Sequence, residues 1–153
     1  MANKIEKRQQ EFNKTIMDGF KGNFNFCPVY FFASENSMFI IKNQIDSVTF
    51  LSRDLKGDSS IRPTEKHLLT IEFADLQQDT TTNPGKLVGM NALIIKNLNF
   101  IQLRDPFPYY TRTFDSIFFL SRSPAKTIRR MNKKLTSYYS NYHKNSTEYA
   151  KPL

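Results

Sequence analysis

The sequence lacks the features that mark several classes of protein. It contains no tryptophan, five glycines and a single cysteine, Cys27. One cysteine cannot form an intramolecular disulfide, which excludes a disulfide-stabilised domain and favours the reducing interior of a cell. No apolar run is long enough to span a membrane, and the first residues are charged rather than signal-like. We therefore expect an intracellular protein without a membrane span.

Signatures of catalysis and of metal binding are scarce as well. The two histidines, His67 and His143, lie far apart in the sequence, and with Cys27 they give no zinc-ligand spacing. There is no glycine-rich phosphate loop, nucleophile motif or paired-carboxylate motif. His67 falls on the apolar side of a candidate strand, where an inner, hydrogen-bonded histidine is the simpler interpretation. We expect no enzyme, no catalytic residue, no metal and no cofactor.

Acidic residues are the minority among the charged ones. The 153 residues include 22 Lys and Arg against 14 Asp and Glu, a formal net charge of +8. Such a balance favours polyanionic partners, either nucleic acid or an anionic membrane, through long-range steering and counterion release. Charge does not determine the fold, but a chain of this length can bury a core as one domain.

Helices are predicted at both ends of the chain. Over residues 4–20 the apolar side chains recur with helical spacing among interspersed basic residues. Near the other end, Ser123 is suited to be an N-cap and Pro124 to be the first residue of a helix. We expect helices in residues 1–22 and 123–143, followed by a flexible tail over 144–153.

Between these helices the apolar pattern changes to the short alternation of strands. Segments rich in Phe, Val and Ile are separated by polar turns and loops. We expect strands at residues 29–33, 38–42, 46–53, 67–74, 93–105 and 115–122. The prediction is a mainly β, small antiparallel barrel over residues 23–122, with a helix at each end, in a single domain.

The segment 93–105 and two loops combine cations with aromatic rings. On an extended strand, one side of the segment would carry a cation, a ring, an amide and a guanidinium, a mixture that suits a flat, negatively charged partner. The loops at 53–66 and 105–113 interleave further cations and rings, the combination by which proteins bind single strands. Alternatively, these are solvated loops and rings that cover a barrel end. The candidate nucleic-acid-binding residues are Arg53, Lys56, Arg62, Lys66, Lys96, Phe100, Gln102, Arg104, Tyr109, Tyr110 and Arg112.

The last helix also carries an apolar stripe. Tyrosines widen this stripe beyond what one side of a small barrel needs, which favours a protein partner. The alternative is that the stripe only caps the barrel. The candidate partner-binding residues are Ile128, Met131, Leu135, Tyr138 and Tyr142.

Several of these segments resemble a known family. "FIIKNQIDSVTFLSRD", "HLLTIEFAD", "VGMNALIIKNLNFIQLRD" and "FDSIFFLS", within about residues 39–120, are similar to the OB-fold of telomere end-binding proteins of the protection-of-telomeres type. The resemblance implies a barrel that binds single-stranded nucleic acid, DNA rather than RNA, between the loops at 54–65 and 105–113. It also implies a nuclear protein, or a small replication protein A-like subunit whose C-terminal helix binds a partner.

Two alternatives stay open. "VYFFASENSMFIIKNQIDSVTFL" also resembles strands of a pleckstrin-homology-like barrel of the histone-chaperone variety, which implies binding to acidic lipid or chromatin. A basic subunit that only docks to protein is the other alternative. The number of strands separates the two barrels, with five expected for the OB-fold and seven for the pleckstrin-like fold.

Overall fold

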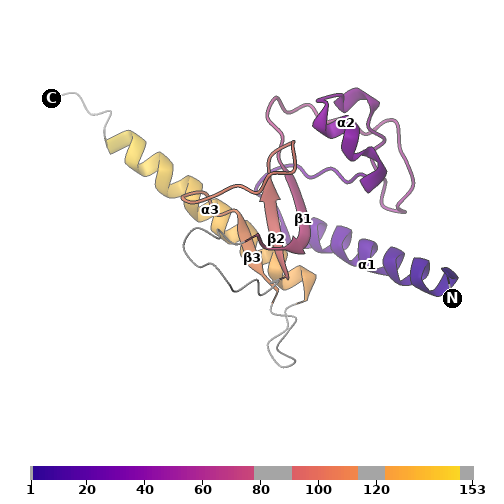
Figure 1. The fold of residues 1–153 in the computed structure, drawn as a ribbon. Coiled ribbons are helices and arrows are strands. Elements are labelled where there is room, and N and C mark those ends of the chain that lie inside the picture. The colour runs from indigo at the N-terminus through magenta and orange to yellow at the C-terminus, as the bar shows by residue number, and fades with distance from the viewer. Residues whose placement is uncertain (1, 78–90, 114–122, 149–153) are drawn as a thin grey trace.

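A three-stranded antiparallel sheet with a long helix from each end of the chain forms the centre of the molecule (Figure 1). The computed structural model describes residues 2–77, 91–113 and 123–148. The helices are α1 (Ala2–Asn23) and α3 (Pro124–Glu148). The strands, in the order β1-β2-β3 across the sheet, are β1 (Thr70–Asp75), β2 (Asn91–Lys96) and β3 (Tyr110–Arg112).

The two long helices pack against the sheet. Alternate residues of β2, Leu93 and Ile95, point toward them, as the period of a strand requires. They join a buried cluster with Phe20 of α1 and with Ile128, Met131 and Leu135 of α3. We call α1, the sheet and α3 the helix–sheet body.

Close packing of α1 on α3 depends on a small residue. Gly19 is buried where the helices meet, and a Cβ atom there would lie 2.9 Å from Cδ1 of Ile128. A larger residue would require the end of the Ile128 side chain to shift, because such a separation is shorter than ordinary van der Waals contact, whereas the Cα atom of Ala125 lies at an ordinary 3.6 Å. Further along α3, the side-chain oxygen of Asn132 accepts hydrogen bonds from the backbone N–H groups of Asn25 and Phe26, each at 3.0 Å.

Residues 30–66 form a second unit, which we call the α2 lobe. It contains the short helix α2 (Ser37–Ile41) between two 3-10 turns, and it lies beyond one end of the sheet (Figure 1). Ile40, Val48 and Phe50 are its buried centre. Leu98 and Phe100, from the turn after β2, pack against this centre and connect the lobe to the body.

The prediction of a mainly β barrel is wrong, for the OB-fold and for the pleckstrin-like alternative. The described residues form an open sheet of three strands. Residues 38–42, predicted as a strand, lie mostly in α2, and the segments 29–33 and 46–53 supply only isolated bridges such as Phe32 to Phe50. The physical reason is that Tyr30, Phe32 and Phe50 pack into a cluster of their own instead of extending the sheet. The predicted strand at 115–122 lies outside the described residues.

The predicted strand at 93–105 is also wrong, because β2 ends at Lys96. The side chain of Asn97 accepts hydrogen bonds from the backbone of Asn99 and Ile101, each at 3.0 Å. Phe100 adopts a positive φ of 58° in this turn. Asparagine is typical of such turns because its side chain can replace a backbone partner. The chain reverses here, so Gln102 lies opposite Lys96.

The predicted ends of the helices agree better with the structure. α3 begins at Pro124, and the Ser123 hydroxyl accepts a hydrogen bond from the backbone of Lys126 at 3.4 Å, as expected of an N-cap. The helix extends to Glu148, past the predicted end at residue 143. The predicted strand at 67–74 begins only at Thr70, so His67 is not on its inner side but exposed.

Candidate functional site

The residues predicted to bind nucleic acid do not share one surface. Arg53, Lys56 and Lys66 are exposed on the α2 lobe. Arg62 donates a hydrogen bond to the backbone carbonyl of Val48 at 3.3 Å, so part of its guanidinium supports the lobe. The loop is thus a solvated, basic edge of the lobe, and Phe100, the ring of the predicted site that packs into this lobe, belongs to its apolar cluster.

The side chains predicted to form one binding face of a strand at 93–105 do not lie on a common face. Lys96 forms an ion pair with Glu72 across the β1–β2 ladder, which neutralises it. The Gln102 amide bonds to both the N–H and the carbonyl of Gln77, each at 3.1 Å. Phe100 is packed into the α2 lobe, and Arg104 is exposed beyond the turn. The turn at Asn97 separates these side chains from one another. Lys96, Phe100 and Gln102 make contacts within the fold instead of forming a shared binding surface.

The remaining predicted residues come together with α3. Tyr109 and Tyr110 pack on the side of the sheet away from the helices, with their ring centroids 4.9 Å apart. The guanidinium of Arg112 lies 5.9 Å from the Tyr110 centroid. Lys134 of α3 lies 5.1 Å from the same centroid and donates to the Tyr110 carbonyl at 2.8 Å. Two cations therefore flank one ring where β3 meets α3.

This ring adjoins a surface that we call the basic face of α3. With about 100° per residue, the exposed cations of the helix gather opposite its buried side. No acidic residue occurs in α3 before Glu148. Arg129 also bonds to the side-chain oxygen of Asn23, at 3.1 and 2.9 Å. The exposed cations of the face are Lys126, Arg129, Arg130, Lys133 and Lys134.

The basic face was not among the predicted site residues, although the sequence contained a signal for it. A charged outer side is the default for an amphipathic helix. The informative signal is the absence of acidic residues, since α1 interleaves its cations with Glu6, Glu11 and Asp18. A helix that only needs to be solvated has no reason to exclude one sign of charge.

The residues predicted to bind a protein partner divide into a buried group and a more exposed group. Ile128, Met131 and Leu135 are buried in the core of the body, so they are not available to a partner in this structure. Tyr138 is half-buried, with its ring 5.6 Å from that of Phe107. Tyr142 is 63 % exposed. The first part of the stripe caps the sheet, and a partner at the tyrosines stays a prediction.

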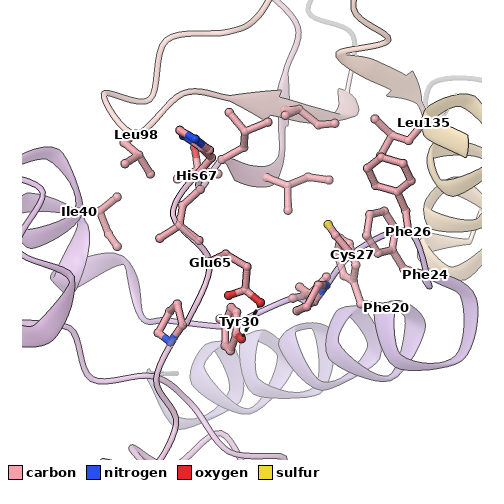
Figure 2. Close-up of a pocket in the computed structure, with 18 of the residues that line it drawn as sticks. Phe20, Phe24, Phe26, Cys27, Tyr30, Ile40, Glu65, His67, Leu98 and Leu135 are labelled. Carbon is pink, nitrogen blue, oxygen red and sulfur yellow. Dashed lines mark hydrogen bonds between the residues drawn. The ribbon is translucent and has the colours of Figure 1, made fainter. Parts of the chain in front are cut away.

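A pocket of about 390 Å³ lies between the body and the α2 lobe (Figure 2). Its wall is mostly aromatic and aliphatic, with Cys27, Tyr30, Glu65 and His67 as polar members. The Tyr30 hydroxyl donates a hydrogen bond to the Glu65 carboxylate at 3.3 Å. Burial and this carboxylate raise the pKa of Tyr30, and they raise the pKa of the Cys27 thiol. Sequence reasoning missed the pocket because its wall comes from segments far apart in the chain.

Two classes of site find no support in the described part of the chain. No group of three or more His, Cys, Asp and Glu side chains that could hold a metal ion occurs among the described residues. In the same residues, no helix has the length and apolar character that crossing a membrane requires. The basic face and the pocket are therefore the two candidate sites.

Comparison with models of protein families, with curated proteins and with solved structures finds no match for this chain. These comparisons neither support nor refute the resemblance to telomere end-binding proteins. The function has to be inferred from the geometry and charge of the two candidate sites.

Proposed function

We propose that the protein binds single-stranded nucleic acid, without catalysis, through the basic face of α3 and the adjoining end of β3. The observation that carries this proposal is a helix face with five exposed cations and no acidic residue before Glu148. Cations on one rigid face follow a phosphate backbone at little entropic cost, and the release of counterions drives the binding.

The preference for a single strand is supported by the Tyr110 ring. Its two neighbouring cations, Arg112 and Lys134, place positive charge beside an aromatic surface. Single-strand binders combine these two elements, with each stacked base contributing about 1–3 kcal/mol. DNA rather than RNA, a telomeric sequence, a nuclear location and a partner subunit are further proposals that rest on the sequence resemblance alone.

The test is fluorescence anisotropy of a labelled single-stranded DNA 20-mer with the full chain, titrated over a range of salt concentrations. Five neutralised phosphates predict a log–log slope of affinity against salt of about −3.5, from roughly −0.7 per phosphate. Replacing Arg130 and Lys133 together by Glu should lower the affinity at low salt by at least about tenfold. The slope should fall in magnitude by about 1.4, since two contacts are lost.

The matched control replaces Lys7 and Lys14 by Glu, because both are exposed on α1 and the change in net charge is the same. This variant should bind within about threefold of the unmodified chain, with the same slope. Equal losses in both variants would show that only net charge matters, and absence of binding at low salt would contradict the proposal outright. An equally tight complex with duplex DNA would contradict the single-strand preference.

A further inference from the structure

The pocket between the body and the α2 lobe has the size and lining of a small-molecule site. Its volume of about 390 Å³ lies within the range of about 300–1,000 Å³ that is usual for such sites. Aromatic side chains come from both units that enclose it, as Figure 2 shows in part. The rings in its wall include Phe24, Phe26 and Phe107, which pack against the core of the body, and Tyr30, Phe32 and Phe50 from the lobe.

One charged carboxylate lies in this aromatic wall. Glu65 is half-buried and is the only Asp or Glu among the lining residues, which all belong to the described part of the chain. Its two oxygens accept from the Tyr30 hydroxyl at 3.3 Å and from the Thr64 backbone at 3.0 Å. The ion pair between described residues is that of Lys96 with Glu72, so no described cation forms an ion pair with Glu65.

The carboxylate selects among the possible occupants. A fatty acid or another anion would bring a second negative charge beside Glu65 in a mostly apolar wall. A neutral apolar molecule would remove water from Glu65 and leave acceptor positions without a donor, since a carboxylate offers about four. A protonated amine supplies both the donors and the opposite charge, and aromatic faces attract such cations.

The net charge of +8 opposes a cation only weakly at this position. Exposed charges are screened beyond a Debye length of about 8 Å at physiological ionic strength, whereas a bound amine would contact Glu65 directly. Direct contact with the carboxylate therefore outweighs the exposed, screened cations of the basic face.

We propose that the pocket binds a small hydrophobic amine, with its apolar part among the rings and its protonated nitrogen on the Glu65 carboxylate beside the Tyr30 hydroxyl. This site is separate from the basic face of α3, and its ligand differs in class from nucleic acid.

Three probes with one apolar body test the proposal: 4-phenylbutylamine, 4-phenylbutanol and 4-phenylbutanoate. Titration calorimetry with the full chain should give at least tenfold tighter binding for the amine than for the alcohol, with the carboxylate weakest. Equal binding of amine and alcohol, tightest binding of the carboxylate, or no binding of the amine would each overturn the proposal.

The variant Glu65→Gln keeps a carbonyl oxygen that can accept from the Thr64 backbone and places an amide NH2 beside the Tyr30 hydroxyl, to which it can donate, but it removes the charge. It should bind the amine and the alcohol with affinities within about threefold of each other. Glu35→Gln is the matched control, because Glu35 is exposed on the lobe and does not line the pocket. It should keep the full preference for the amine, and a preference that survives Glu65→Gln would contradict the assigned role of Glu65.

A second measurement does not depend on the folding of any variant. Cys27 lines the pocket, so its alkylation by iodoacetamide reports on occupancy. At saturating amine the alkylation rate should fall at least fivefold, whereas the same concentration of the carboxylate should leave it unchanged. Amine binding detected by calorimetry without protection of Cys27 would place the amine elsewhere and overturn the site.

Discussion

The helix–sheet body and the α2 lobe both bury apolar side chains, but they hold them by different means. In the body, Leu93, Ile128 and Met131 are fully buried between regular helices and strands. In the lobe, Ile40, Val48 and Phe50 are surrounded by partly buried side chains from turns and isolated bridges. Segments with few backbone ladders and few buried contacts open at lower free energy. We therefore expect the body to determine global stability and the lobe to open by itself.

The largest effect should follow Leu93→Ala in the body. Removing a fully buried leucine lowers the free energy of unfolding by about 2–5 kcal/mol through lost burial and the cavity left behind. This is a large part of the stability of a domain, and urea titration followed by circular dichroism measures it. Leu69→Ala is the control, because Leu69 is 54 % exposed and its replacement should change stability by about 0.5 kcal/mol or less. Similar effects of the two substitutions would contradict the assigned core.

Val48→Ala should have a smaller and more local effect. Two buried carbons contribute roughly 1.5–2.5 kcal/mol, including the cavity they leave. Hydrogen exchange should show lost protection in residues 30–66 with little change in β2. Uniform loss of protection in both regions would show that the lobe and the body unfold as one unit, which would remove the distinction between them.

The smallest effect should come from Glu72→Gln on the sheet. The ion pair of Glu72 with Lys96 is partly solvated, since the Glu72 side chain is 41 % exposed. Such pairs contribute about 0.2–1 kcal/mol, and salt weakens them. Thermal unfolding at low and high salt should show a small destabilisation that shrinks as salt rises. A loss of more than about 2 kcal/mol in the free energy of unfolding would contradict this, because it would mean that Lys96 is left as an unpaired charge away from solvent.

The same contrast explains which parts of the fold the sequence could predict. Both long helices were predictable, because their apolar stripes extend over many turns and Ser123 and Pro124 mark the start of α3. In the lobe, segments rich in Phe, Val and Ile were interpreted as strands, but strand preference depends on neighbouring strands that are absent there. Asn97 and Asn99 were a sequence signal for the turn. The alternation of apolar residues on both sides of them nevertheless led to the prediction of one continuous strand.

The candidate sites were less predictable than the fold. Tyr110 and Arg112 were identified, but their neighbour Lys134 is brought to them only by the packing of α3 on β3. The pocket depends on Tyr30, Glu65 and Leu135 meeting in space, and no local pattern relates these positions. Residues that function through tertiary contacts leave no periodic signal in a single sequence.

The pairing of α1 with α3 has a consequence for the order of events on the ribosome. Asn25, just after α1, bonds to Asn132 of α3 across 107 positions of sequence. The apolar side of α1 therefore emerges early and cannot complete its packing until α3 has been synthesised, because Ile128, Met131 and Leu135 belong to the same cluster as Phe20. The contacts within the lobe can form sooner. Long-range contacts slow folding, and surfaces that wait for them are prone to aggregation. During translation, α1 thus exposes apolar side chains that a chaperone could cover until α3 has emerged.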